Sequence, residues 1–572
     1  MITELETGGI PVLLAPSTGP MHAGLVFRVG TVDEPLSRRG ITHLVEHLAL
    51  HSIGVADHHF NGATGPEFTF FHMRGAETDV VGFLNGVCAA LRDLPMQRLA
   101  VEKEILRTEE NSRGDGAGEV LALWRHGAVG YGAGTYPEWG LRGITADDLR
   151  GWTARYFNRQ NAALWITGSE VPAGLDLDLP DGDRQPVPAP SSALPVRPAW
   201  FPGHSNIVAW DAVVPRGAAA TVFAGVLERV LFRSLRQESG LSYTVKSDCS
   251  TRADGTTVVT ALADALPEKQ GAVLGAFVDV LAGMRLGLVD EADVTAVVNR
   301  RAAEVIEAAE NGGRLPGQVF SLLTGQPVQK SDDEFLAGLR AVSRADVVAI
   351  AAAATADGLL MTPGRHRADW AGFTAAPTRS TDVVSGKSHQ QLGHRSVDEP
   401  KVLLTIGADG VTIGTDDDPA TVRFDQCVLL LAWPDGARRL IGPDAIQVHF
   451  EPTLFRNGTA ITAEIDAGLD PALRVVMPVR NPESVPVPRK APPPPSLGAR
   501  ARWIARNGRL VYSLIFNAVM TLVVGVLAIA GTVALFRDGE FAFGLGAGAV
   551  FLGLAGVFGL SLRNTIREIR RS

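Results

Sequence analysis

Two apolar runs near the C-terminus restrict the fold of this 572-residue chain more than any other part of its sequence. One runs from Leu510 to Phe536, the other runs from Phe541 to Leu562, and only the polar sequence RDGE separates them. A helix of roughly 20 apolar residues crosses the hydrocarbon core of a bilayer, so each run is long enough to span a membrane. The pair predicts a two-helix transmembrane hairpin over residues 510–562. Two buried helices of a soluble domain are the alternative.

Arginines flank the outer ends of both runs and predict the orientation of the hairpin. Positively charged flanks stay in the cytoplasm. We therefore expect an integral protein of the cytoplasmic membrane, with its large N-terminal part and its basic tail at 563–572 on the cytoplasmic side. The flanking arginines are Arg500, Arg502, Arg506, Arg509, Arg563, Arg567, Arg570 and Arg571.

Composition excludes several other classes of protein. The formal net charge of -9 gives no general attraction to nucleic acid, and no cluster of basic residues with interleaved aromatic residues occurs before residue 400. The three cysteines, Cys88, Cys249 and Cys427, form no CxxC pair, which argues against a disulfide framework or a thiolate zinc site. The N-terminal sequence lacks the basic and apolar regions of a cleaved secretory signal. We therefore expect no nucleic-acid partner and no cleaved export signal.

The sequence before the apolar runs mixes strand and helix patterns without a regular βαβ alternation, which favours the α+β fold class. We expect a first α/β domain at 1–175, a Pro-rich linker at 176–196 and a second α/β domain at 197–375. The second domain repeats the order strand, helix, strand of the first. This repetition is consistent with an ancient duplication.

The region after the second domain has a different pattern. A polar stretch at 376–400 predicts a flexible linker. Short alternating apolar runs separated by turn residues then predict a small β-domain at 401–480, which faintly resembles PH-like modules. A Pro-rich basic spacer at 481–509 leads to the hairpin.

The run HLVEH, from His43 to His47, places titratable side chains in an otherwise apolar segment. Residues three and four apart share one face of a helix, so His43 and His47 can direct two imidazoles at one point with Glu46 beside them. Burying such groups costs free energy unless a partner compensates. Imidazole and carboxylate suit Zn²⁺, and H-x-x-E-H is the inverzincin motif. A chance pair of histidines at this spacing is the alternative.

A catalytic zinc ion needs a third protein ligand. The sequence VEKEILRTEEN supplies candidates, because Glu102 and Glu109 lie two turns apart on one face of a predicted helix. A solvated acidic helix face is the alternative. The loop histidines His51, His58 and His59 are also available as ligands, although exposure to solvent is the simpler expectation for them.

Four stretches resemble the M16 family of zinc metallopeptidases, the group of pitrilysin, insulinase and the mitochondrial processing peptidase. GITHLVEHLAL is similar to the metal-binding helix of the family, and FNGATGPEFTFF is similar to its N-x-x-T-x-x-E-x-T-x-[YF] strand. EKEILRTEE resembles its E-x-x-x-x-x-x-E helix, and LRQESGLSYTV resembles its R-x-x-x-G-L-x-Y element. The interval between the first and third stretches is shorter than usual in the family. The resemblance covers residues 1–375.

The resemblance implies two tandem M16-type α/β-sandwich domains and a Zn²⁺ ion held by His43, His47 and Glu109. It also implies that Glu46 is the catalytic base and that Glu102 supports the site. The implied activity is that of a membrane-tethered zinc endopeptidase that hydrolyses extended peptides or unfolded segments. The residues expected to contact the peptide substrate are Asn61, Ala63, Arg236 and Tyr243.

In the M16 family two such two-domain halves enclose a chamber, so the resemblance implies a homodimer or a partner M16 half. A catalytically silent subunit that binds peptides or supports a partner peptidase is the alternative reading. The complete set of ligands and base favours the enzyme, because a silent subunit has no chemical need for all four residues. A third reading gives the β-domain and the hairpin a scaffold role in assembly.

Overall fold

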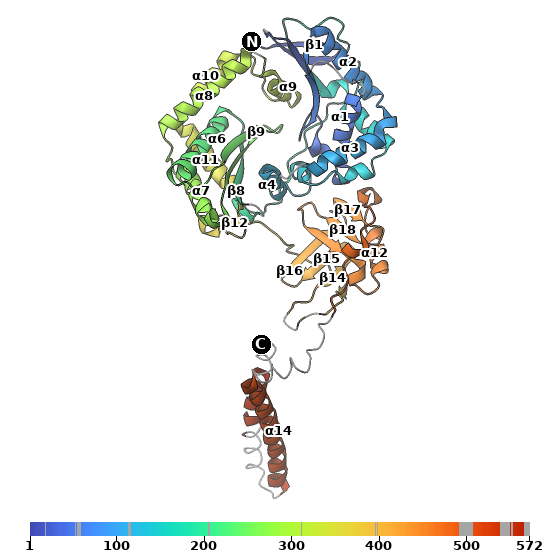
Figure 1. The fold of residues 1–572 in the computed structure, drawn as a ribbon, viewed down its shortest axis with the longest axis vertical. Coiled ribbons are helices and arrows are strands. Elements are labelled where there is room, and N and C mark those ends of the chain that lie inside the picture. The colour runs from blue at the N-terminus through green and yellow to red at the C-terminus, as the bar shows by residue number, and fades with distance from the viewer. Residues whose placement is uncertain are drawn as a thin grey trace. The chain divides into compact units, whose positions relative to one another are not determined.

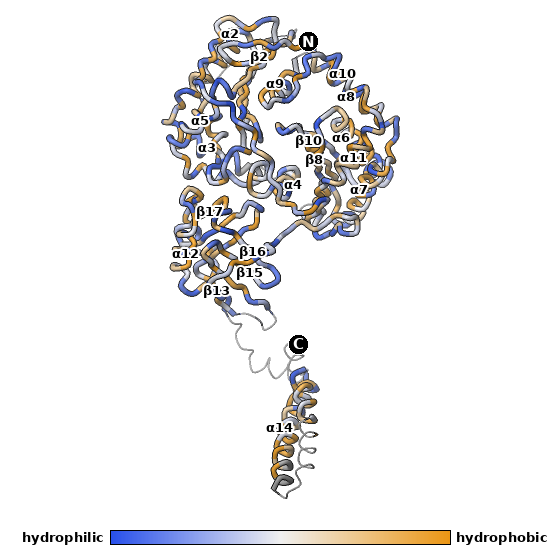
Figure 2. Tube along the Cα trace, turned by 180° about the vertical axis from the view of Figure 1, so that it is seen from behind, coloured by the Kyte–Doolittle hydropathy of each residue, from blue (hydrophilic) through white to orange (hydrophobic). Residues whose placement is uncertain are grey.

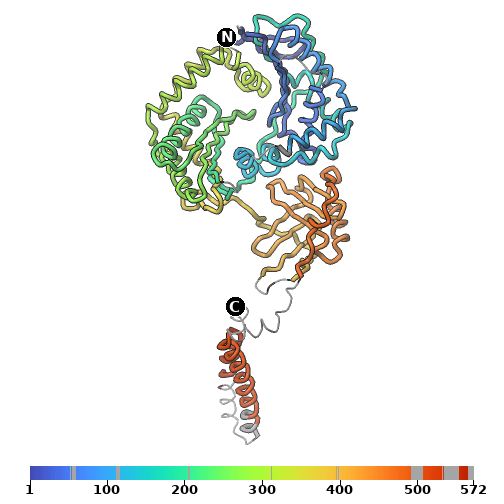
Figure 3. Tube along the Cα trace, in the orientation of Figure 1, coloured from blue at the N-terminus to red at the C-terminus, as the bar shows by residue number. Residues whose placement is uncertain are grey.

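The computed structural model describes residues 1–17, 19–51, 53, 59–112, 116–203, 206–310, 312–394, 396, 399–490, 507–537, 550 and 553–564. The chain divides into two units, Met1–Arg489 and Lys490–Ser572, which are described separately. Figure 1 shows the helices and strands of each unit, and Figure 3 shows the course of the chain through them.

A six-stranded mixed sheet forms the centre of the first α/β domain, with strand order β1, β2, β6, β3, β5, β4. Side chains alternate between its two faces: in β5, Phe71 and Met73 are buried on one face, and Phe70 and His72 lie on the other. The strands are β1 (Thr3–Thr7), β2 (Ile10–Ala15), β3 (Met21–Phe27), β4 (His59–Thr64), β5 (Thr69–Gly75) and β6 (Ala162–Thr167). The helices that share the Phe71 core are α1 (Ile41–His51), α2 (Glu77–Arg92), α3 (Leu99–Ser112) and α5 (Ala146–Tyr156).

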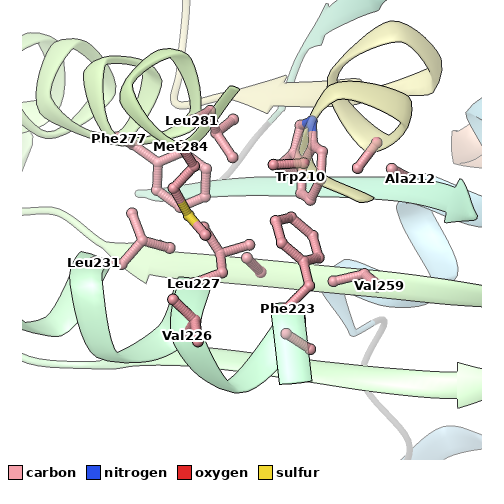
Figure 4. Close-up of a cluster of buried hydrophobic side chains, with 14 of the residues drawn as sticks. Trp210, Ala212, Phe223, Val226, Leu227, Leu231, Val259, Phe277, Leu281 and Met284 are labelled. Carbon is pink, nitrogen blue, oxygen red and sulfur yellow. The ribbon is translucent and has the colours of Figure 1, made fainter. Parts of the chain in front are cut away.

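The second α/β domain is built around another six-stranded sheet, with order β12, β7, β11, β8, β10, β9. Its core contains Trp210, Phe223 and Phe277, which pack together as Figure 4 shows. The strands are β7 (Ala199–Pro202), β8 (Ile207–Pro215), β9 (Val245–Thr251), β10 (Thr256–Asp264), β11 (Leu359–Thr362) and β12 (Thr374–Ala375). The helices of this core are α6 (Ala218–Leu231), α7 (Gln270–Arg285), α8 (Glu291–Glu310), α10 (Asp332–Arg340) and α11 (Arg344–Asp357).

Five strands of each sheet follow the same pairing scheme. The pairs β2–β6 and β7–β11 are both parallel, and the pairs β3–β6 and β8–β11 are both antiparallel. Antiparallel pairs then continue outward through β5 and β4 in the first sheet and through β10 and β9 in the second. This shared topology supports the duplication that the order of elements suggested.

The two domains exchange helices. Helix α4 (Ala117–His126) follows α3 in the chain but packs on the second sheet, where Leu121 is buried and Trp124 stacks on Phe201 with ring centroids 4.5 Å apart. Conversely, α9 (Leu315–Leu323) follows α8 but packs on the first sheet, on the face opposite α1, where Leu315 contacts the Trp165 cluster. Each sheet therefore carries a helix from the other half of the chain on one of its faces (Figure 1).

Buried polar side chains join the two domains. Arg125, in α4, donates to Asp211 at 2.6 Å and to Asp357 at 2.8 Å. The buried Asp211 and the partly buried Asp357 form charge-assisted hydrogen bonds with one buried guanidinium, and removal of one partner leaves an uncompensated charge. The relative placement of the two sheets therefore depends on this cluster as well as on apolar contacts.

His126, at the end of α4, is held as a neutral imidazole. Its Nδ1 donates to the Ser191 carbonyl at 2.6 Å, and its Nε2 accepts from Arg252 at 2.8 Å. A proton on Nε2 would face the Arg252 guanidinium. Burial, followed by the charge of Arg252, lowers the pKa of His126 from 6.5 to about 3.

The third part of the N-terminal unit contains two four-stranded sheets and α12 (Gly458–Ala467) around a core that includes Leu430, Phe450 and Ile461. One sheet has β13 (Lys387–Gln390), β14 (Leu403–Ile406), β15 (Gly410–Thr415) and β16 (Asp418–Arg423). The other has β19 (Gln447–Phe450), β18 (Arg438–Ile441), β17 (Leu429–Ala432) and β20 (Arg474–Val476). β13 lies in the stretch expected as a linker. Leu429 and Ile441 pack with Leu36 of the first domain.

The C-terminal unit contains α14 (Gly508–Arg537), which is apolar along its length (Figure 2). Its segment Gly508–Ala530 is long and apolar enough to cross a membrane. Of the second predicted span, 541–562, the structure describes residue 550 and residues 553–562, which are helical; its other residues lie outside the described part of the chain, as does most of the tail at 563–572. The structure therefore describes one candidate span, and the hairpin stays a prediction.

We expect His126 to make the domain interface sensitive to acid. Below pH 6.5 the unfolded chain binds a proton on this histidine that the folded chain does not bind, so stability falls as the pH falls. The expected loss is about 2 kcal/mol between pH 7.5 and 5.0. His126→Gln, which removes this titration, should lose less thermal stability than the wild type over the same range.

The control for this comparison is His394→Gln, because His394 is exposed. Thermal unfolding midpoints at both pH values should fall equally in the control and the wild type. An equal fall in His126→Gln would show that the imidazole of His126 is not the group that titrates.

Candidate metal centre

Helix α1 places both motif histidines and Glu46 at its buried face. Gly40 and Thr42 donate backbone N–H groups to the Glu34 carboxylate, at 3.0 and 2.8 Å. A carboxylate at a helix N-terminus stabilises the helix, so Glu34 fixes where α1 begins. His43 and His47 follow on one face, with ring centroids 4.8 Å apart.

Helix α3 brings a carboxylate to this histidine pair. Glu109 lies 3.8 Å from His43 Nε2 and 3.6 Å from His47 Nε2. One ligand atom from each of the three residues lies within 4.8 Å of the others. The structure therefore brings together the three residues that the resemblance implied as metal ligands, despite the short interval between the two motifs.

Glu102 lies two helical turns before Glu109 in α3 and contacts the other ring nitrogen of His47. Its Oε2 is 3.4 Å from His47 Nδ1, and its Oε1 accepts from Arg98 at 3.0 Å. Glu102 is 4% exposed. This carboxylate can hold the His47 ring so that Nε2 points toward Glu109, which is the supporting role that the resemblance implied.

Glu138 makes the equivalent contact to His43 and was missed in the sequence. Its Oε1 lies 3.0 Å from His43 Nδ1, and its backbone N–H donates to Glu110 at 2.5 Å. Glu138 lies in the loop sequence TYPEWG, which has no periodicity or motif that marks a site. Metal-binding histidines commonly bond a carboxylate through their second ring nitrogen, so only the folded chain identifies this residue.

The side chain of Glu46 packs closely against Gly62 in β4. A Cβ atom at Gly62 would lie 2.9 Å from Glu46 Cγ, so only glycine lets the strand approach this closely. The Thr64 hydroxyl donates to Glu46 at 2.6 Å. Burial raises the pKa of Glu46, and the hydrogen bond from Thr64 opposes that rise.

The predicted peptide-contacting residues lie in two places. Asn61 and Ala63 lie in β4, the edge strand of the first sheet next to Glu46. Arg236 lies in the π-helix Phe232–Glu238 of the second domain, with its guanidinium 4.6 Å from the ring centroid of Tyr243. Tyr243 is 74% exposed. The structure pairs Arg236 with Tyr243 but, among the described residues, does not join them to the histidine cluster.

The other histidines near the motif lie outside the cluster. His51 Nδ1 is 4.0 Å from Glu102, and His59 is exposed at the start of β4. His58 is outside the described residues. Neither described histidine joins His43, His47 and Glu109 as a ligand.

The donor set fits a zinc ion in its chemistry. Ligands of a tetrahedral zinc with bonds of about 2.05 Å lie about 3.4 Å apart, close to the separations between Glu109 and the two imidazoles. Carboxylates also outnumber cations here, and like charges in a buried site are costly without a neutralising cation. The carboxylates are Glu46, Glu102, Glu109, Glu110 and Glu138.

Comparison with solved structures identifies the fold. The chain is similar to a protease from Helicobacter pylori, with TM-score 0.54 and 15% identity, over 64% of this chain and 99% of that one. It is similar to a peptidase M16 inactive domain from Pseudomonas fluorescens, with TM-score 0.54 and 14% identity, over 64% and 98% of the two chains. A chain of Complex III2 from Candida albicans with Inz-5 bound has TM-score 0.51 and 13% identity, over 64% and 95%.

No family model matches the sequence, and no curated protein matches it. The structural similarity confirms the M16 fold expected from the motifs. One of these neighbours is an inactive domain, so the fold alone is compatible with either a peptidase or a silent subunit.

Proposed function

We propose that this chain is a zinc-dependent endopeptidase that hydrolyses extended peptides or unfolded segments. The observation that carries the proposal is the convergence of His43, His47 and Glu109 beside a buried Glu46. The contacts of Glu138 and Glu102 with the outer ring nitrogens further support a metal site. A silent subunit would need none of these groups.

The roles of the residues follow from their positions. Zn²⁺ bound by His43, His47 and Glu109 would supply a Lewis acid that polarises a peptide carbonyl and acidifies water. Glu46 would accept a proton from the attacking water and pass it to the leaving amine. Transfer of this kind contributes about 10²- to 10⁴-fold in rate.

The free edge of β4 supplies a surface for an extended substrate. A peptide that adds to this edge pairs through its backbone, so sequence preference should be broad. Asn61 and Ala63 would contact the added strand. Arg236 and Tyr243 would contact the bound peptide through guanidinium and hydroxyl donors if the second domain or a second copy of the chain faces it. A homodimer or a partner M16 half would supply such a face.

We further propose that α14 anchors the peptidase to the cytoplasmic membrane. Its length and apolar composition support a span. The arginines on its N-terminal side support a cytoplasmic peptidase, because such flanks stay on that side of the membrane.

Zinc content should depend on Glu109. The full-length wild type should bind about one zinc per chain, and Glu109→Ala should lower zinc affinity more than about 100-fold, because a ligand is lost rather than a residue that supports one. Glu138→Gln should lower it about 10- to 100-fold. Metal analysis after dialysis against a zinc buffer measures both effects.

The matched control is Glu104→Ala on the same helix, whose side chain is 69% exposed. This variant should bind zinc as the wild type does. Wild-type zinc affinity in Glu109→Ala would contradict the proposed ligand set.

Hydrolysis should depend on Glu46. Glu46→Gln keeps the size of the side chain but removes the base, so cleavage of an unstructured fluorogenic peptide should fall about 10²- to 10⁴-fold while zinc remains bound. Removing zinc from the wild type with a chelator should abolish cleavage, and adding zinc back should restore it. Stoichiometric zinc without cleavage in the wild type would favour the silent subunit.

Membrane association should depend on the C-terminal unit. The full-length chain should stay with membranes after an alkaline carbonate wash, because α14 is long and apolar enough to cross a bilayer. A chain that ends at Arg489 should be released into the supernatant. Retention of that shortened chain in the washed membranes would contradict the anchor.

A further inference from the structure

A second cavity lies on the opposite face of the first sheet from α1. It is open to solvent, has a volume of about 540 Å³, and lies between β3, β5 and β6 on one side and α9 on the other. Its lining includes residues of both α/β domains but none of the three clustered metal-ligand candidates. The aromatic residues of its wall are Phe68, Phe70, Trp165 and Phe320.

Arg216 brings a cation without a counter-ion to this wall. Its Nη2 donates to the Ser321 hydroxyl at 2.7 Å, whereas its Nη1 is buried and has no hydrogen-bond partner. No carboxylate of the described residues forms an ion pair with Arg216, and burial lowers the pKa of its guanidinium. An unpaired cation beside aromatic rings costs free energy that a carboxylate from a ligand would offset.

Trp165 supplies a second donor without an acceptor. It is 2% exposed, and its indole Nε1 has no hydrogen-bond partner. His22 and His72, whose ring nitrogens are 3.3 Å apart, form another part of the wall. No acidic residue of the described chain lines the cavity. An apolar pocket that has the guanidinium of Arg216 in its wall favours an apolar group that carries a carboxylate.

We propose that this cavity binds the C-terminal residue of the peptide substrate, with an apolar side chain against the aromatic wall and the terminal carboxylate at Arg216. This proposal rests on the proposed peptidase function. It adds a substrate class to that function, namely peptides with a free, apolar C-terminus. Because Arg216 and α9 belong to the second domain, the bound terminus would also hold the two domains together.

The register of β4 and β5 supplies the path from the metal centre. Asn61 and Ala63 pair with His72 and Phe70, so these residues share the cavity face. Gly62 lies on the α1 face, next to Glu46. A peptide beside β4 thus has one set of side chains directed to each face. The cavity lies about three strand spacings, or ~14 Å, from such a peptide, which about four extended residues can cross.

Peptide binding to the full-length chain in lipid nanodiscs tests the proposal. Every protein in the series carries Glu46→Gln, so that the probe is not cleaved. The probe is a fluorescein-labelled unstructured peptide that ends in Phe, with either a free C-terminal carboxylate or a C-terminal amide. The free acid should bind about tenfold more tightly than the amide, because a charge-assisted hydrogen bond is lost in the amide.

Two substitutions examine the cavity in different ways. Arg216→Gln should make the acid and the amide bind equally. Gly317→Leu should weaken binding of the free acid about tenfold or more by filling the cavity, since a Cβ atom there meets no atom within 4 Å and the fold should tolerate it. The matched controls are Arg340→Gln and Gly338→Leu in α10, both at exposed positions, which should leave binding unchanged.

Equal binding of the acid and the amide to the protein with an intact Arg216 would overturn the proposal. So would binding of laurate that depends on Arg216 while the peptide acid shows no such dependence, because the cavity would then be a lipid site. The readout does not require hydrolysis. A failure here leaves the zinc and cleavage tests intact, and a failure of those tests leaves the preference for a free C-terminus measurable.

Discussion

The exchange of α4 and α9 between the two α/β domains is the constraint on which the N-terminal unit depends. Each six-stranded sheet has one face covered by its own helices, and its other face carries further apolar side chains. Burial of one large apolar side chain stabilises a fold by about 1.5–3 kcal/mol, so an uncovered face would be costly. The exchanged helices cover these faces, with Phe201 under α4 and Trp165 under α9. Neither sheet is complete without the other half of the chain.

A contact with the second domain also holds the strand that borders the candidate site. The turn between β4 and β5 contains Glu67, whose buried carboxylate accepts from the Ala253 backbone N–H at 2.8 Å and from the Tyr131 hydroxyl. Ala253 belongs to the second domain. The position of β4, and with it the contact of Thr64 with Glu46, is therefore held from the second domain. A fixed edge beside Glu46 is what the proposed strand-adding substrate would require.

The site and the second cavity share the first sheet but lie on opposite faces of it. On one face, α1 and α3 gather carboxylates and imidazoles that call for a cation. On the other face, the guanidinium of Arg216 lies beside α9 and would favour an anionic ligand. A peptide that binds as we propose would pass between the two, with its backbone near Glu46 and its terminus within reach of Arg216. Side chains alternate between the two faces in β4 and β5, so residues next to each other in these strands face different sites.

The sequence by itself determined the local features of this protein. Helical spacing put His43 and His47 on one face, apolar length marked α14 as a candidate span, and the resemblance to M16 peptidases predicted the fold and the approach of Glu109 to the two histidines. Tertiary structure alone decided that Glu138 bonds His43, that the two domains exchange helices, and that Arg216 has no ion-pair partner among the residues that the structure describes. The physical reason is the separation along the chain of the residues that interact. Periodicity records which side chains share a face of one element, whereas contacts between a loop and a distant helix form only when the whole chain packs.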